Sequence, residues 1–237
     1  MTTVGCLLVH GWMVTGGVWN ELASKLGVPT AAPTLVPPPS LVPTTTLETL
    51  AAVVLDEATR AGFERFHLVG HSMGGQIAQL AAAMGKGRVR SLSLVNSVPL
   101  SGLALPPDVA AVFRSSGDNR TAQAAIVDQA CLELTPKAKD ALLADAATIA
   151  PAWIARAFDL FSKGDDPAKL AEISCPTLVV ATSDPFLPPS FLEQTIVSKI
   201  AGAKLAVLEG PGHYPQIERP DALASVLRAF LDEVERR

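Results

Sequence analysis

The sequence predicts an α/β fold in which helices cover both faces of a mostly parallel sheet. Short apolar runs alternate with longer helix-like stretches through much of the 237-residue chain, as in successive βαβ units. These runs show little polar alternation, which is typical of strands buried on both faces. One of them leads into a glycine-flanked serine and then into a helix-like stretch, a strand–turn–helix sequence.

The first hundred residues contain four predicted strands and three predicted helices. The strands are the apolar runs Val4–Val9, Thr30–Val36, Phe66–Val69 and Arg90–Val95, and prolines at 37–43 end the second. Between them lie the predicted helices Val18–Leu26, Thr46–Ala61 and Gln76–Met84. Threonines near the start of the second helix are available for N-capping.

From residue 100 to residue 171 strand signals disappear. Alanine-rich stretches, several opened by proline, predict the helices Pro107–Arg114, Thr121–Leu132, Pro136–Ile149 and Pro151–Phe161. A crossover between parallel strands needs only one helix, so we expect residues 100–171 to form a helical cap. Residues 1–99 and 172–237 would then form the core domain.

Strand-like apolar runs reappear after the helical segment. Pro176–Ala181 and Lys204–Leu208 are predicted strands, and the helix Ser190–Ile200 lies between them. The amphipathic pattern of Asp221–Arg236 predicts a final helix that covers the sheet.

Composition narrows the classes of function. The chain is 49% hydrophobic, 18% charged and carries a net charge of −4 with no basic run, which disfavours nucleic acids and membrane surfaces as partners. Three widely spaced cysteines predict reduced thiols and a cytoplasmic protein, and the first apolar run is too short for a signal peptide. The four histidines lack metal-site spacing, so we expect neither a metal nor a cofactor.

The most informative motif is Gly70-His71-Ser72-Met73-Gly74-Gly75. A serine between a strand and a helix, flanked by glycines, is the pattern of a nucleophile elbow, in which a strained turn exposes the hydroxyl. We therefore predict that Ser72 is a nucleophile.

A serine nucleophile needs a base, and the four histidines can be compared by position. His67 lies inside a strand and is expected in the core. His71 is adjacent to Ser72 and poorly placed to face it, while His10 ends the first strand and is expected to brace a loop. His213 follows the last strand in a glycine-rich loop, at the edge where parallel sheets place their sites, and is the predicted base.

An acid must orient that base. Asp184 comes just after the strand Thr177–Ala181, in a loop at the same edge as Ser72 and His213, and is the predicted acid. Other acidic candidates belong to the helical segment or end a strand: Asp159, Asp165, Asp166 and Glu209.

An oxyanion needs two backbone N–H donors. One is expected from Met73, directly after the serine, and the other from Trp12, after Gly11 in the loop that follows the first strand. The Trp12 indole is a candidate for the wall of the acyl pocket. The other residues expected to line the substrate pocket are Gly11, Met13, Phe158, Phe186 and Tyr214.

Four motifs together resemble the α/β-hydrolase superfamily over nearly the whole chain: His-Gly-Trp, Gly-His-Ser-Met-Gly-Gly, the Asp184 loop and Gly-Pro-Gly-His. The chain resembles small bacterial carboxylesterases, including those that act on pimeloyl methyl esters, and is similar to the plant methylesterase and hydroxynitrile lyase group. The resemblance implies a Ser72–Asp184–His213 triad, oxyanion donors at Trp12 and Met73, and a helical cap after the sixth strand of the family. Relatives often carry an additional N-terminal hairpin, so about six strands are expected here.

Relatives with other chemistries differ at key positions. Epoxide hydrolases and haloalkane dehalogenases have an aspartate where this chain has Ser72. Hydroxynitrile lyases carry threonine at the position of Gly11, and cofactor-free haloperoxidases carry proline in the loop that holds Met13 and Val14.

The sequence thus predicts a serine carboxylesterase for a small, largely apolar ester, monomeric or homodimeric. A lactonase, a thioesterase, or a C–C bond hydrolase or lyase could use the same triad. A small-molecule binding protein with vestigial turnover is the alternative from another class.

Overall fold

The computed structural model describes residues 4–236 and contains one six-stranded sheet in which all neighbouring strands are parallel. The strand order is β2-β1-β3-β4-β5-β6. The strands are β1 (Gly5–Val9), β2 (Thr30–Ala31), β3 (Phe66–His71), β4 (Val89–Val95), β5 (Thr177–Thr182) and β6 (Lys204–Leu208). The predicted parallel sheet of about six strands is confirmed.

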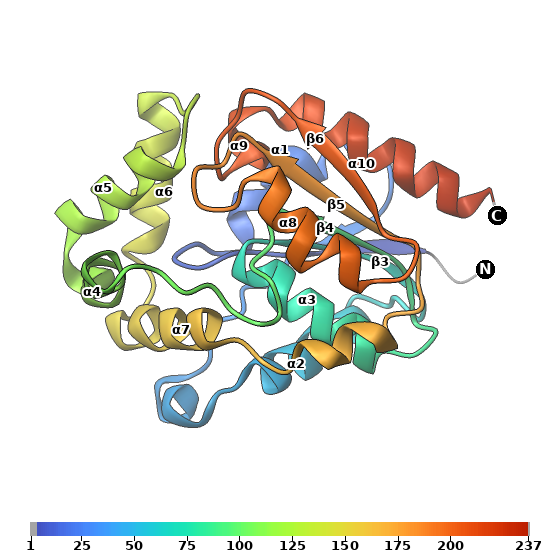
Figure 1. The fold of residues 1–237 in the computed structure, drawn as a ribbon, viewed down its shortest axis with the longest axis horizontal. Helices are drawn as coiled ribbons and strands as arrows, with labels where there is room; N and C mark the ends of the chain where they lie inside the picture. Colours follow the sequence, from blue (N-terminus) through green and yellow to red (C-terminus); the bar gives the residue numbers. More distant parts are fainter. Residues whose placement is uncertain (1–3, 237) are drawn as a thin grey trace.

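Helices cover both faces of this sheet (Figure 1). On one face α2 (Leu47–Arg60) packs against α3 (Met73–Met84), and α3 lies directly on β3. On the other face α1 (Asn20–Ala23) packs against α10 (Pro220–Glu235). Strands β1, β3 and β5 are buried along their whole length, which explains their unbroken apolar sequences.

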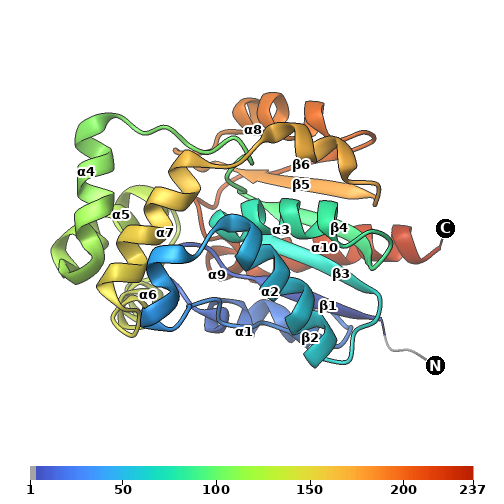
Figure 2. The ribbon, with the colours of Figure 1, turned by 90° about the horizontal axis from the view of Figure 1, so that it is seen from below.

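The segment between β4 and β5, which we call the helical insertion, contains α4 (Pro107–Ser115), α5 (Arg120–Ala130), α6 (Pro136–Ala146) and α7 (Pro151–Lys163). Figures 1 and 2 show these helices gathered beyond the carboxyl ends of the strands. The four helices predicted in this segment are present, with ends shifted by a few residues.

Several boundaries differ from the predictions. The second strand has two residues instead of seven, because Pro33 has no N–H for the sheet and Leu35 donates its N–H to His10 instead. A 3₁₀ turn, Gly16–Trp19, replaces the start of the first predicted helix. The helix expected at 190–200 breaks after α8 (Pro189–Thr195), and the short helix α9 (Pro215–Glu218) was not predicted.

Within residues 4–236 no single helix is both long and apolar enough to cross a membrane. Only α6 and α7 taken together reach that length and composition, across a bend of 100°. All three cysteines are free thiols.

Candidate active site

Ser72 occupies a strained turn between β3 and α3. Its backbone has φ 54° and ψ −124°, a conformation that costs free energy for any residue with a side chain. Hydrogen bonds hold it there, because the Ser72 carbonyl accepts the N–H groups of Gly75, Gln76 and Val98 at 2.9, 3.2 and 3.1 Å. The predicted strained turn between a strand and a helix is thus present at Ser72, whereas its role as a nucleophile stays a prediction.

The first turn of α3 also packs tightly against the end of β1. A Cβ atom at Gly74 would lie 2.2 Å from the carbonyl oxygen of His10, so only glycine fits. This close approach places the loop after β1 beside Ser72.

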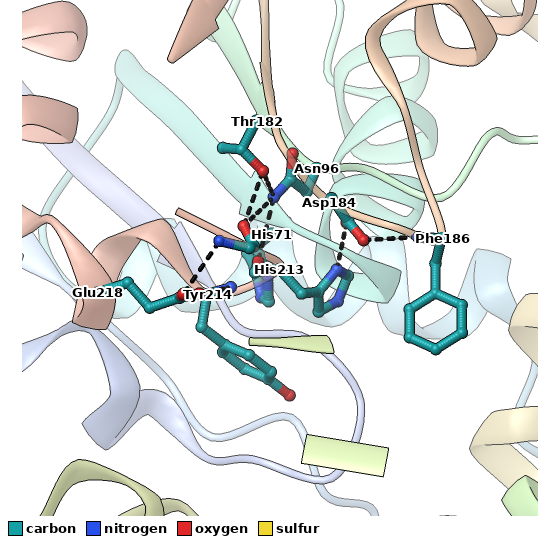
Figure 3. A network of polar contacts seen from close by, with 9 residues as sticks. His71, Asn96, Thr182, Asp184, Phe186, His213, Tyr214 and Glu218 are labelled. Carbon is teal, nitrogen blue, oxygen red and sulfur yellow. Dashed lines mark hydrogen bonds and ion pairs between the residues drawn. The ribbon is translucent and has the colours of Figure 1, made fainter. Parts of the chain in front are cut away.

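His213 and Asp184 are in direct contact although 29 residues separate them (Figure 3). His213 Nδ1 lies 2.6 Å from Asp184 Oδ2, and the other carboxylate oxygen accepts the Phe186 N–H at 2.8 Å. The Asp184 side chain is fully buried, whereas that of His213 is 14% exposed. Because a carboxylate only accepts, Nδ1 carries the hydrogen and the Nε2 lone pair is left to take a proton.

A second layer of polar groups, which the sequence analysis did not predict, holds the His213 loop. The Asn96 amide donates to Thr182 Oγ1 at 2.8 Å and to the carbonyls of Gly212 and His213 at 3.1 and 3.2 Å. Thr182 Oγ1 donates to the Gly212 carbonyl at 2.7 Å (Figure 3). The signal that could have found Asn96 is its position as a polar residue directly after β4, at the carboxyl edge of the sheet.

His71 belongs to the same layer. Its Nε2 lies 2.8 Å from the His213 carbonyl and must therefore be the donor. Burial, and then the neighbouring His213, keep the pKa of His71 well below 6.5, so the ring is neutral. His71 therefore supports the His213 loop, a role that the sequence did not predict, and among the described residues it makes no hydrogen bond to the serine hydroxyl.

The two remaining histidines have structural contacts, as predicted. His10 accepts the Leu35 N–H at 2.8 Å and fixes the loop after β2 to the end of β1. His67 is buried in the sheet, 2.8 Å from Ser91 Oγ. Among residues 4–236 no group of three or more His, Cys, Asp or Glu side chains is arranged to hold a metal ion.

The two candidate oxyanion donors lie in the loop after β1 and at the first residue of α3. In the part of the chain that the structure describes, neither the Trp12 N–H nor the Met73 N–H has a hydrogen-bond partner. The Trp12 indole donates to the Ile154 carbonyl of α7 at 2.8 Å, and the N–H and hydroxyl of Thr15 donate to Asp145 of α6 at 2.7 and 2.8 Å. The helical insertion therefore anchors this loop.

Ser72 and His213 both line one cavity of about 560 Å³, a volume that includes its open mouth. The cavity has no charged lining residue apart from the titratable His213 and is otherwise mainly apolar. Its other lining residues are Trp12, Met13, Val98, Leu103, Leu105, Phe113, Ile126, Val127, Ala130, Phe161, Phe186, Leu187 and Tyr214. Among the described residues the Ser72 hydroxyl makes no hydrogen bond, so it faces this space unpaired.

The expected pocket residues divide into two groups. Met13, Phe186 and Tyr214 line the cavity with Trp12, whereas Gly11 and Phe158 do not. Phe158 is only 1% exposed because it packs behind the rings of Phe113 and Phe161, and these two phenylalanines form the wall in its place. Gly11 lies behind Ser72, where a Cβ would be 3.0 Å from that of the serine. Both placements correct the sequence prediction.

Comparison with known proteins shows the family of this chain. Residues 6–226 match the family described as "Alpha/beta hydrolase family". The chain belongs to this family. "Pimeloyl-[acyl-carrier protein] methyl ester esterase" of Neisseria meningitidis is 28% identical over 96% of this chain and 76% of its own length. The predicted resemblance to small bacterial esterases is thus confirmed.

A second relative is much longer than this alpha/beta hydrolase. "Polyketide synthase ThaQ" of Burkholderia thailandensis is 34% identical over 71% of the chain, but the match spans only 9% of that protein.

Solved structures show the same fold. The bromoperoxidase of Bacillus anthracis superimposes with a TM-score of 0.88 at 20% identity and covers 98% of this chain and 92% of its own. An enol-lactonase of Burkholderia xenovorans has a TM-score of 0.84 at 19% identity, covering 98% and 92% of the two chains.

Proposed function

We propose that this alpha/beta hydrolase is a serine carboxylesterase that uses Ser72 as nucleophile, His213 as base and Asp184 to orient the base. The observation that carries the proposal is the 2.6 Å contact between His213 and Asp184 at the wall of the cavity onto which the strained Ser72 opens. Membership of the family and the similarity to bacterial methyl ester esterases support the same reaction.

In the proposed reaction the Ser72 hydroxyl gives its proton to His213 Nε2 while Oγ attacks the ester carbonyl. The developing oxyanion takes the free N–H groups of Trp12 and Met73. His213 then returns the proton to the alkoxide as the C–O bond breaks, which leaves an acyl-enzyme. Water, deprotonated by His213, hydrolyses this intermediate and restores Ser72.

The contact between serine and histidine would form during substrate binding. Catalytic hydrogen bonds are often made only once the substrate is in place, and Ser72 and His213 already face the same space. Asp184 stabilises the imidazolium that appears during each proton transfer.

The lining of the cavity supports a small and largely apolar substrate. Five aromatic side chains and several aliphatic ones surround the two polar groups of the proposed triad, and a charged acyl or alcohol group would lose its hydration there. The wall contributed by α4, α5 and α7 supports the proposal that the insertion acts as a cap over the site.

The proposal is tested with p-nitrophenyl esters of increasing acyl length and with a fluorophosphonate probe. We expect turnover of short and medium esters and covalent labelling at Ser72, both lost in Ser72→Ala and retained in Ser101→Ala, an exposed serine outside the cavity. A protein that binds these esters without turnover or labelling would be the vestigial binding protein. Turnover that survives in Ser72→Ala would refute the mechanism.

A further inference from the structure

The Glu218 carboxylate bonds the loop of the proposed base, as Figure 3 shows, and also bonds the end of α5. Its Oε1 accepts the N–H of Tyr214 at 3.0 Å, and its Oε2 accepts the N–H of Gly212 at 2.9 Å. These two residues flank His213. One side chain of α9 therefore holds the base loop on both sides of the histidine.

The same carboxylate holds the end of α5 in the helical insertion. Oε2 also accepts the N–H groups of Leu132 and Glu133, at 2.9 and 2.8 Å. Because α5 ends at Ala130, these are the first backbone groups beyond its cap residue Cys131. Glu218 thus binds backbone donors of two segments about 80 residues apart in sequence.

The two segments also touch directly. The N–H of His213 donates to the Ala130 carbonyl at 2.8 Å. A Cβ at Gly212 would lie 2.3 Å from that same carbonyl oxygen, so glycine is needed for the contact. A displacement of α5 by even a fraction of an ångström would therefore press on the histidine loop.

The α5 helix is part of the substrate cavity. Ile126, Val127 and Ala130 line it together with His213. A substrate that contacts these side chains pushes on the helix whose end is bonded to Glu218. Pocket occupancy and the position of the base are then mechanically linked.

We propose that Glu218 is a positioning residue that couples occupancy of the α5 wall to the alignment of His213. The inference rests on the proposed function, because alignment matters only if His213 is the base. A carboxylate suits this place since it accepts hydrogen bonds at both oxygens, whereas a glutamine would turn an NH₂ group toward one of the backbone donors.

A neighbouring ion pair supplies the matched control. Asp128 of α5 pairs with Lys139 of α6 at the surface, where both side chains are partly exposed. Surface pairs of this kind contribute little. Asp128→Asn is therefore the corresponding carboxylate-to-amide substitution on α5 itself, without effect on the four backbone hydrogen bonds of Glu218.

The test measures kcat and KM with p-nitrophenyl acetate and hexanoate. In Glu218→Gln we expect kcat to fall about ten-fold for both esters, because a misplaced base slows proton transfer. KM should rise for the hexanoate alone, since only the longer chain reaches α5. Leu132→Pro removes one of the bonded N–H groups from the insertion side and should give the same pattern more weakly.

Amide hydrogen exchange provides a readout independent of activity. In Glu218→Gln the segments 130–133 and 212–214 should lose protection together, while Asp128→Asn should match the wild type. If the wild type neither hydrolyses esters nor reacts with the fluorophosphonate, the proposed function fails and hydrogen exchange alone decides the coupling. The proposed coupling would be overturned by unchanged kcat and KM in a folded Glu218→Gln protein, or by loss of amide protection in only one of the two segments.

Discussion

Replacing Asp184 with asparagine tests the centre of the proposed mechanism. In the wild type one carboxylate oxygen accepts from His213 Nδ1 and the other from the Phe186 N–H. An asparagine side chain has one acceptor and one donor at these two places. In either orientation its NH₂ group faces a nitrogen, either Nδ1 of the imidazole or the backbone N–H of Phe186.

Both orientations are costly because the Asp184 side chain is fully buried. If the NH₂ group faces His213, it donates to Nδ1, the hydrogen moves to Nε2 and the base can no longer accept a proton. If it faces Phe186, a buried donor is left unpaired, which costs about 1–3 kcal/mol. The imidazolium also loses a charge-assisted partner in the transition state, which adds about 1.5–3 kcal/mol.

The sum is about 3–6 kcal/mol, which corresponds to a loss of roughly 10²- to 10⁴-fold in kcat/KM. The assay is steady-state hydrolysis of p-nitrophenyl butanoate, with thermal unfolding to show that the variant is folded. Asp159→Asn is the control, because it breaks only a surface ion pair with Arg114. A decrease of less than about five-fold, with turnover still dependent on Ser72, would refute this account of Asp184.

Three further predictions follow from the site and its surroundings. Asn96→Ala removes three buried hydrogen bonds and places alanine at φ 39°, so urea unfolding should show a loss of about 3 kcal/mol; an unchanged midpoint would mean that the network does not support the fold. Val127→Phe fills the α5 side of the cavity and should lower kcat/KM for the hexanoate about ten-fold more than for the acetate; equal effects would place the acyl chain elsewhere. Burial lowers the pKa of His10, His67 and His71 below 6.5, so the unfolded chain takes up protons that the folded chain does not. The contribution of these histidines to the free energy of unfolding should therefore be fully present above pH 6.5. It should decrease below pH 6.5, by at most about 1.4 kcal/mol per pH unit for each histidine. A free energy of unfolding in urea that stays constant over this pH range would contradict the effect.

The sequence predicted what depends on local pattern. Buried strands are continuous apolar runs, so the sheet could be anticipated strand by strand, except where prolines shortened β2 to two residues. The strained turn at Ser72 followed from glycines between a strand and a helix. His213 and Asp184 each follow a strand, and the carboxyl ends of parallel strands lie at one edge, so their meeting was also predictable.

Only the tertiary structure decided which side chains complete the surroundings of the site. Phe113 and Phe161 line the cavity while Phe158 does not, because the face that a helix presents depends on how it packs against its neighbours. Asn96 and Glu218 carry no motif, and their partners come from segments far away in the chain. A hydrogen bond between distant segments is set by the relative placement of whole elements, and local sequence does not contain that placement. The local geometry at Ser72 could therefore be predicted from the sequence, whereas the connection between the cavity wall and the His213 loop required the fold.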